Sequence, residues 1–549
     1  KKEMNLIKIL DEHAVLQPDR IALRDFRANV DRAVTYRSLQ KLTESAAEKL
    51  IDSGVRKDDR VLLAVSMRIE TYILLLALFR IGAVVVIVDP SGGLQSLRRS
   101  LELVRPHAMI STARIRLLSS LIKEMRSIRV KLLAKQIIST IGSATAYQTK
   151  SESIGLPLAV EDVNPEHPAL ITFTSGSTGA PKAIVRTHGF LLNQHKVLAS
   201  SLPGQTSDVE LTTLPVFVLS ALARGITSVL PNCDMRKPAS IDAQRIVRQL
   251  KACGVNRIIA SPAFLQRVSE YLQSENLAIK ELTQVLTGGG PVFPCLLKEL
   301  QTVFPKAELI AVYGSTEAEP IAHVSSKEMS SEDLQKTFEG NGLLAGKPIQ
   351  EIELAIVNPA ELNAFSSGMS KKFNRLPAYV TGEIVVRGNH VVKTYLNGLG
   401  DAETKISGCS KRINVAKIWH RTGDAGYLDS EGRLWLMGRC AVKISDERGE
   451  LYPFQVEAAA SEIPTIRRAT CLKFGDKRVL VIETKRSSLK EQMRRIWQQA
   501  KPLKDTVGDA FAWLRFDEIR LVDSIPVDAR HNAKIQYGRL KQRLGVVGY

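Results

Sequence analysis

Apolar and polar positions along the chain predict helices and buried strands in alternation. Ile73–Phe79 is a helix-like apolar stretch, and Val84–Val88 is an unbroken β-branched run that ends at a Pro and Gly turn. Three further buried strands stop at Gly, Pro or Ser, in Arg257-Ile-Ile-Ala-Ser-Pro, Gln284-Val-Leu-Thr-Gly-Gly-Gly and Glu308-Leu-Ile-Ala-Val-Tyr-Gly. This pattern favours α/β layers with largely parallel sheets, in which ligands bind at the carboxyl ends of the strands.

From about Val380 the pattern changes to short β-runs separated by Gly and Asp turns, as in Glu383-Ile-Val-Val-Arg and Arg433-Leu-Trp-Leu-Met. After Gly438 the chain is long enough for a separate small domain. We therefore predict an α/β protein with a large N-terminal domain of layered α/β sheets plus a β-subdomain (residues 1–438). A small α+β C-terminal domain (residues 439–549) follows.

The most apolar stretch, Tyr72–Val88, is interrupted by Arg80 and Gly82. It is short for a membrane span and predicts a buried helix that leads into a strand. The first ten residues carry charges where a signal peptide needs an apolar core. The six cysteines stand far apart without a C-x-x-C pair, which indicates neither a metal site nor a disulfide framework and favours a reducing cytoplasm.

The formal net charge of +19 calls for a partner or compartment that explains it. Nucleic acid is not indicated, because zinc-finger spacing, an RNP signature and a basic heptad region are all missing from the sequence. An anionic small substrate, an acidic carrier protein and a membrane surface with its associated pathway enzymes remain open. The net charge alone does not discriminate among these three kinds of partner.

Residues 172–186 read Thr-Phe-Thr-Ser-Gly-Ser-Thr-Gly-Ala-Pro-Lys-Ala-Ile-Val-Arg and follow a short apolar strand. Glycines let a backbone approach an anion closely, and hydroxyls and a lysine supply donors and positive charge. The spacing is not that of a Walker A loop, and a Ser/Gly linker would not be flanked by apolar strands. The predicted phosphate-binding residues are Thr174, Ser175, Gly176, Ser177, Thr178, Gly179 and Lys182.

Three further motifs follow the phosphate loop in order: Tyr313-Gly-Ser-Thr-Glu-Ala-Glu-Pro, Arg421-Thr-Gly-Asp-Ala-Gly-Tyr, and Lys534 in Pro526-Val-Asp-Ala-Arg-His-Asn-Ala-Lys-Ile. Over nearly the whole chain, this set resembles the adenylate-forming superfamily of acyl-CoA synthetases, peptide-synthetase adenylation domains and luciferases. The resemblance implies ATP and Mg²⁺ as cofactors, a small-molecule acyl substrate, and a mobile C-terminal domain.

The chemistry brings a carboxylate to the α-phosphorus of ATP, so developing negative charge must be neutralised. By resemblance, the phosphate loop holds the β- and γ-phosphates, Thr316 contacts the α-phosphate and Glu317 binds Mg²⁺. Tyr313 and the adjoining Gly314 lie at the adenine, and Asp424 and Arg439 at the ribose. Lys534 lies between the substrate carboxylate and the α-phosphate. Taken singly, Glu317 would be a solvated carboxylate, Asp424 a turn residue and Lys534 an exposed helix lysine.

Two features concern the acyl substrate. Val218, in Phe217-Val-Leu-Ser, stands where peptide-synthetase domains carry an aspartate for the substrate ammonium group, so an α-amino acid is disfavoured. The segment Thr287-Gly-Gly-Gly-Pro-Val suits an acyl chain better, and its Gly289 is predicted to belong to the cofactor-binding residues.

Departures from the common acyl-CoA ligase pattern point to one subfamily. Ala441 replaces the hinge aspartate, Ala183 and Ala533 replace glycines, and Lys534 lies eight positions after Pro526, two more than usual. The motifs Pro-Val-Asp-x-Arg-His-Asn-x-Lys-Ile, Gly-Gly-x-Pro-Val and Tyr-Gly-x-Thr-Glu-Ala-x-Pro are similar to those of the olefin-pathway β-lactone synthetases. In those enzymes the hydroxyl of a 3-hydroxy fatty acid displaces AMP. An internal nucleophile gains a large effective molarity and needs no thiol tunnel.

Three alternatives stay open from the sequence. The acyl group could pass to CoA or a carrier protein, and a chain with an inactive site could be a nucleotide-dependent scaffold. His531 is a candidate base for the hydroxyl proton, although a capping or structural role explains it equally well.

Overall fold

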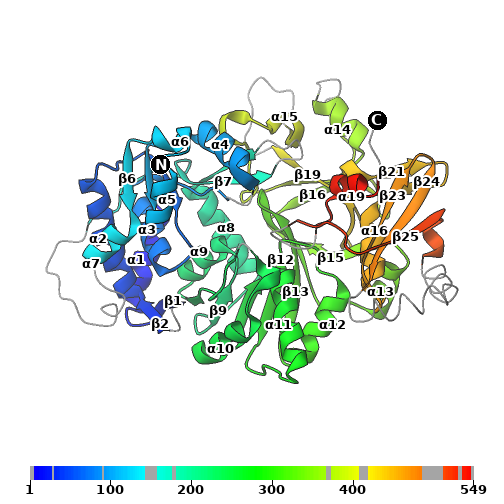
Figure 1. The fold of residues 1–549 in the computed structure, drawn as a ribbon, viewed down its shortest axis with the longest axis horizontal. Coiled ribbons are helices and arrows are strands. Elements are labelled where there is room, and N and C mark those ends of the chain that lie inside the picture. The colour runs from blue at the N-terminus through cyan, green and yellow to red at the C-terminus, as the bar shows by residue number, and fades with distance from the viewer. Residues whose placement is uncertain are drawn as a thin grey trace.

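The structure, a computed structural model, describes residues 5–27, 30–89, 92–141, 158–175, 181–235, 237–366, 373–406, 418–484, 511–528 and 534–545. Within these ranges the strands form sheets of six, fourteen, two and three strands. In Figure 1 the chain passes from the N-terminal sheet and helices, in blue, through the largest sheet in the centre to the C-terminal sheets, in orange and red.

The six-stranded sheet has the order β6-β5-β3-β4-β7-β8 and is parallel except for the β7–β8 pair. Its strands are β3 (Arg60–Ala64), β4 (Val84–Val86), β5 (Ala108–Ser111), β6 (Val130–Leu133), β7 (Pro168–Ser175) and β8 (Pro181–Thr187). The helices before β7 are α1 (Ile7–Leu16), α2 (Tyr36–Asp52), α3 (Ile69–Arg80), α4 (Gly93–Val104), α5 (Ala113–Leu118), α6 (Lys123–Arg126) and α7 (Ala134–Ile141). This arrangement confirms the predicted parallel α/β layer.

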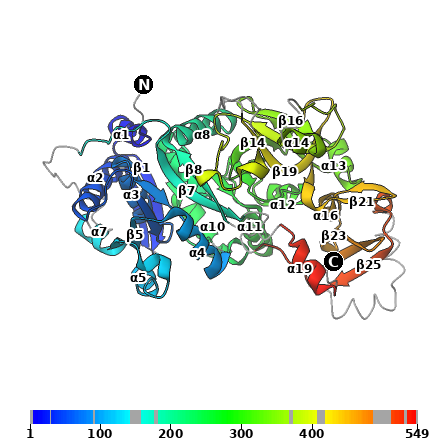
Figure 2. The ribbon, with the colours of Figure 1, turned by 90° about the horizontal axis from the view of Figure 1, so that it is seen from above.

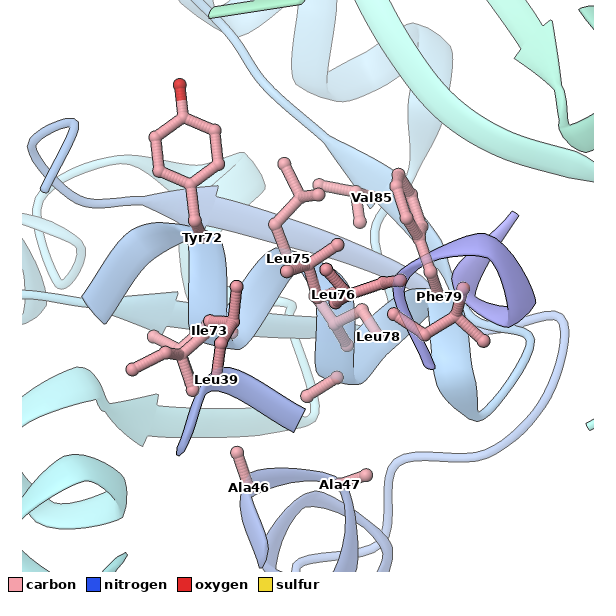
Figure 3. Packing of buried hydrophobic residues seen from close by; sticks show 14 of the residues in the cluster. Leu39, Ala46, Ala47, Tyr72, Ile73, Leu75, Leu76, Leu78, Phe79 and Val85 are labelled. Carbon is pink, nitrogen blue, oxygen red and sulfur yellow. The ribbon is translucent and has the colours of Figure 1, made fainter. Parts of the chain in front are cut away.

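Helix α3 is the buried helix that the apolar stretch predicts, and it leads into strand β4. It packs against α2, where Leu39 and Ala46 face it, and against Val85 of the sheet (Figure 3). Its last residue, Arg80, is buried and pairs with Asp11 at 2.5 Å, which explains a charge inside an apolar helix.

The fourteen-stranded sheet changes at β13: the side before it is parallel except for the terminal β1–β2 pair, and the other side is antiparallel. The side before the change has β1 (Ile21–Arg27), β2 (Val30–Thr35), β9 (Val209–Thr212), β10 (Thr227–Val229), β11 (Arg257–Ala260), β12 (Gln284–Gly288) and β13 (Glu308–Ser315). The other side has β14 (Ala318–Ser325), β15 (Leu343–Pro348), β16 (Glu353–Val357), β17 (Gly382–Arg387), β18 (Lys405–Ile406), β19 (Trp419–Leu428) and β20 (Leu434–Arg439). The antiparallel half corresponds to the predicted β-subdomain.

Helices of this region are α8 (His188–Ser201), α9 (Pro215–Ala223), α10 (Ala243–Cys253), α11 (Pro262–Ser274), α12 (Pro294–Val303), α13 (Ser331–Phe338), α14 (Pro359–Ser366) and α15 (Asp401–Thr404). The apolar cluster under α10, α11 and α12 contains Phe264 and Trp435, so it joins the parallel and antiparallel halves. This cluster therefore packs strands of both halves of the large sheet into one core.

The C-terminal region consists of β21 (Ile444–Asp446), β22 (Gly449–Leu451), α16 (Pro453–Ser461), β23 (Ile466–Phe474), β24 (Lys477–Thr484), β25 (Glu518–Val522) and α19 (Tyr537–Arg543). Helix α16 packs against α13 and β20, and Gln455 donates to the Gly340 carbonyl at 2.6 Å. Lys298 and Glu462 form an ion pair across the same junction at 2.7 Å. In Figures 1 and 2 helix α19 lies on the side of this region that faces the large sheet.

Within the described ranges, no helix is long and apolar enough to cross a bilayer. The last strand of the large sheet, β20, ends at Arg439. The domain boundary at residues 438/439 stays a prediction.

Candidate functional site

The carboxyl ends of β12 and β13 lie side by side because these strands pair in parallel, with Gly288 opposite Val312. A Cβ on Gly288 would stand 2.6 Å from the Val312 carbonyl oxygen, and Gly289 has φ of 80°, so both positions favour glycine. The predicted acyl segment therefore begins at the strand edge where the predicted nucleotide motif begins.

The motif that starts at Tyr313 forms the tight connection between β13 and β14. A Cβ on Gly314 would approach the Ala318 carbonyl oxygen to 2.9 Å, which explains the glycine. Thr316 at the corner is exposed, and Arg186 donates to its carbonyl at 2.9 Å. Arg186 is buried in β8, and this burial lowers its pKa from the ordinary value. One buried cation thus fixes the backbone at the corner.

The predicted phosphate loop connects two antiparallel strands, β7 and β8. Thr174 at the end of β7 stands opposite Lys182 of β8, and Ser175 is the last residue of β7. The predicted residues Gly176, Ser177, Thr178 and Gly179 lie outside the described residues. The structure therefore places the two flanks of the loop.

Glu317 is the point at which three distant segments meet. The Thr174 hydroxyl donates to its Oε1 at 3.5 Å, and the Tyr395 hydroxyl donates to the same oxygen at 2.9 Å. The backbone N–H of Val392 also donates to the Glu317 carbonyl at 2.8 Å. Burial and the nearby carboxylate raise the pKa of Tyr395 above its ordinary value, so it stays a neutral donor.

Two lysines flank the Tyr395 ring. Lys182 Nζ lies 5.5 Å and Lys405 Nζ 5.0 Å from the ring centroid, distances at which a cation interacts with an aromatic face. Lys182 also pairs with Glu403 at 3.6 Å, and burial lowers the pKa of Lys405 to about 8. A Cβ on Gly400 would stand 2.8 Å from the Lys182 side chain, so this glycine leaves room for it.

Sequence reasoning missed Tyr395, Lys405 and Arg186. Tyr395 and Lys405 lie in a stretch of mixed polarity without a recognisable spacing, and Arg186 reads as one more strand residue. The sequence here offers only an aromatic residue and a lysine close to two acidic residues. This combination is too common in proteins to identify a binding site.

A second cluster joins Tyr313 to the antiparallel half of the sheet. Its hydroxyl donates to Asp424 Oδ2 at 2.8 Å, and Arg439 Nε pairs with Asp424 Oδ1 at 3.1 Å. Asp424 and Arg439 stand opposite each other in the β19–β20 pair. Burial and the Asp424 charge raise the pKa of Tyr313 well above its ordinary value. The three predicted adenosine-binding residues are thus linked in one chain of contacts.

Lys534 is exposed at the base of a small hairpin in the C-terminal region. Its carbonyl accepts from the Asp528 N–H at 2.9 Å, its own N–H donates to Asp528 Oδ1 at 2.9 Å, and Val527 pairs with Ile535. The two ends of the segment from Pro526 to Lys534 are therefore held next to each other. His531 and Ala533 lie outside the described residues.

Val218 lies on α9 and is buried in the apolar cluster of the N-terminal sheet. An aspartate there would be desolvated, and burial of an unpaired charge is costly. The position therefore agrees with an acid that lacks an α-ammonium group.

The oxygen ligands around Glu317 are too few to bind a hard cation alone, so the cation would also need phosphate oxygens as ligands. No group of three or more His, Cys, Asp or Glu side chains suited to a metal ion occurs in the part of the chain that the structure describes. A half-buried carboxylate beside a phosphate loop matches the oxygen ligands that Mg²⁺ shares between protein and nucleotide.

Comparison with known proteins identifies the family of this chain. A family model described as AMP-binding enzyme matches residues 10–396. The chain is 29% identical to an olefin beta-lactone synthetase from Xanthomonas campestris pv. campestris, over 97% of this chain and 96% of that protein. It is 28% identical to an olefin beta-lactone synthetase from Stenotrophomonas maltophilia, with the same coverage of 97% and 96%.

The fold is similar to that of a solved O-succinylbenzoate coenzyme A synthetase from Bacillus subtilis in complex with ATP and magnesium ion. The TM-score is 0.72 at 22% identity, over 98% of this chain and 99% of that one. This similarity confirms the predicted fold class of a large α/β domain and a small C-terminal domain.

Proposed function

Since this chain belongs to the family of AMP-binding enzymes and is an ATP-dependent, adenylate-forming enzyme, we propose that it activates a 3-hydroxy fatty acid and closes the acyl-adenylate to a β-lactone. The observation that carries this proposal is the full-length similarity to two olefin beta-lactone synthetases. Ala441 and the longer spacing between Pro526 and Lys534 support it, because both depart from the acyl-CoA ligase pattern.

In the first step a substrate carboxylate oxygen attacks the α-phosphorus of ATP, and pyrophosphate leaves. Lys182 and the hydroxyl-rich loop from Thr174 to Thr178 hold the pyrophosphate oxygens, and Thr316 contacts the α-phosphate. Glu317 would hold Mg²⁺, which neutralises phosphate charge when bound. Tyr395 orients Glu317 through the hydrogen bond at 2.9 Å.

The same step needs the adenosine and the carboxylate to be held in register. Tyr313 stacks on adenine, and its bond to Asp424 aligns the carboxylate that binds the ribose diol. Lys534, from the domain that we place at residues 439–549, bridges the substrate carboxylate and the α-phosphate. Because its positive charge neutralises both anions, Lys534 stabilises the negative charge that develops as the carboxylate attacks the α-phosphate.

In the second step the 3-hydroxyl oxygen attacks the acyl carbon. The bond from that carbon to the bridging phosphate oxygen breaks, AMP leaves, and a four-membered ring closes. The hydroxyl proton passes to the departing phosphate or to His531. The His531→Ala variant separates these routes, since loss of lactone with normal pyrophosphate release assigns the proton to the histidine.

The test measures pyrophosphate, AMP and product with a panel of acids, with and without CoA. A 3-hydroxy fatty acid is expected to give equal amounts of pyrophosphate, AMP and lactone without CoA. The matched acid without the hydroxyl is expected to give pyrophosphate and a retained adenylate. Accumulation of acyl-CoA would contradict the second step, and absence of pyrophosphate with every acid would contradict the first.

A further inference from the structure

The positive charge of the chain is concentrated in one stretch. Residues 93–135 contain ten Lys and Arg against two Asp and Glu, a formal charge of +8 out of +19 for the whole chain. The stretch forms α4, β5, α5, α6, β6 and the start of α7, at the β6 edge of the six-stranded sheet. Nine of the ten basic residues are exposed: Arg98, Arg99, Arg105, Arg114, Arg116, Lys123, Arg126, Arg129 and Lys135.

The same surface exposes leucines that the core does not use. Helix α5 buries none of its residues, and Leu117 and Leu118 at its end are 75% and 46% exposed. Leu121, just beyond, is 79% exposed, and Leu94 at the start of α4 is 60% exposed. Grouped exposed leucines are unusual for a soluble surface and indicate an interaction site.

These elements form one continuous face. Arg98 of α4 pairs with Glu124 of α6 at 3.1 Å, and Lys131 of β6 donates to the Arg126 carbonyl at 3.0 Å. Arg116 of α5 donates to the Lys131 carbonyl. Figure 2 shows α5 projecting at the margin of the N-terminal region with α4 beside it. We call this face, residues 93–135, the basic leucine face.

We propose that the basic leucine face binds the surface of an anionic lipid membrane, with Leu117, Leu118 and Leu121 inserted among the headgroups. An interfacial segment combines apolar side chains that enter the acyl boundary with Lys and Arg that attract anionic headgroups. Both are present here, and the charge complementarity selects an anionic surface.

A protein partner is less well matched to this face. Residues 93–135 contain no Phe, Tyr or Trp, the aromatic residues that are enriched in the centres of protein interfaces. The basic side chains are spread over α4, α5, α6 and their connections, which suits a charged surface better than a single docking motif. The proposal does not depend on the identity of the acyl product, because it uses none of the residues of the ATP site.

The experiment measures flotation of the full chain with vesicles of phosphatidylcholine alone or with about 30 mol% phosphatidylglycerol, at low and high salt. We expect at least about tenfold stronger binding to the anionic vesicles, weakened by salt. The triple variant L117S/L118S/L121S is expected to lower binding about tenfold, and R99Q/R114Q is expected to lower it only at low salt.

The matched control is V15S/L16S on α1, where two side chains are 78% and 76% exposed beside the acidic Glu12 and Asp19. This control should bind vesicles like the unchanged chain, and all variants should keep their melting temperature and their pyrophosphate release in solution. Absence of binding to anionic vesicles would overturn the proposal. So would binding that the three leucine substitutions leave unchanged, or binding to an acidic carrier protein without binding to vesicles.

Discussion

The proposed ATP-binding edge of the large sheet and the hairpin of Lys534 are built in opposite ways. At the sheet edge, Glu317 and Asp424 are held by hydroxyl and guanidinium donors from segments far apart in sequence. Lys534 is exposed, and its described hydrogen bonds run through its backbone to Asp528 of the same hairpin. The first region is preorganised by long-range contacts, whereas the second is a local element closed by a single bridge between Val527 and Ile535.

Because of this difference, substitutions in the two regions are expected to affect the reaction in different ways. A change among the cross-linked residues alters how the nucleotide and its metal are held, so it changes binding as well as rate. A change at Lys534 removes a charge that acts when the two anions meet, so it changes the rate of adenylation with little effect on ATP binding.

The largest effect is expected for Lys534→Ala. Loss of the bridging cation should lower the rate of pyrophosphate release by at least about 100-fold and leave the KM for ATP within about threefold. The matched control is Lys541→Ala, an exposed lysine of α19, which should keep full activity. Near-normal release by Lys534→Ala would remove this residue from the reaction.

Glu317→Gln should lower pyrophosphate release by about 10- to 100-fold and raise the Mg²⁺ concentration needed for half-maximal rate. The amide keeps the size of the side chain and its bond to Tyr395 but loses the charge. Glu332→Gln, an exposed carboxylate on α13, serves as the control. An unchanged Mg²⁺ requirement in Glu317→Gln would contradict the assigned metal role.

Tyr395→Phe should have a smaller effect, because it removes only the hydroxyl that holds Glu317. A hydrogen bond to a charged group contributes about 1.5 to 3 kcal/mol. The lower value applies here because Thr174 still donates to the same Glu317 oxygen, so the rate should fall about 10-fold, with a higher Mg²⁺ requirement. Tyr427→Phe is a matched control, since the Tyr427 hydroxyl donates to the Asn341 carbonyl away from Glu317. A merely structural role of Tyr395 would lower the melting temperature without changing the Mg²⁺ requirement.

The smallest effect concerns the support of the Lys534 hairpin. Buried Glu457 accepts from the hydroxyls of Tyr537, at the start of α19, and Thr470, with Arg468 nearby, and burial raises the pKa of Glu457 to about 7. The folded state then binds a proton more tightly than the unfolded state. The resulting stability is full below pH 4.5 and is lost as the pH rises through about 7.

Thermal unfolding measured between pH 5 and pH 8 tests whether the stability decreases as the pH rises. In this range the free energy of unfolding should fall by about 1 to 3 kcal/mol from Glu457 alone, and Glu457→Gln should remove that part of the pH dependence. Glu447→Gln, an exposed carboxylate of the same region, should leave the pH dependence unchanged. An identical pH profile in Glu457→Gln would show that the carboxyl does not titrate with folding.

The fold and the order of the site motifs could be predicted because they depend on local patterns. The buried strands that end at Gly288 and Ser315, and the helix before Val84, follow from apolar runs and turn residues. Tyr395 and Lys405 could not be predicted, since their positions depend on loops that return to Glu317 and Lys182 from more than 70 residues away. The two-residue extension before Lys534 was visible in the sequence, but the pairing of Val527 with Ile535 on either side of it was not, because that pair has no local sequence signal.

The most direct test of the account follows the oxygen atoms of a 3-hydroxy fatty acid labelled with ¹⁸O in its carboxylate, without CoA. If the carboxylate attacks ATP and the hydroxyl then closes the ring, AMP gains one ¹⁸O and the lactone retains one ¹⁸O in its carbonyl group. Mass spectrometry of both products is expected to give this result. AMP without label, or a lactone that retains both labelled oxygens, would contradict activation of the carboxylate followed by intramolecular displacement of AMP.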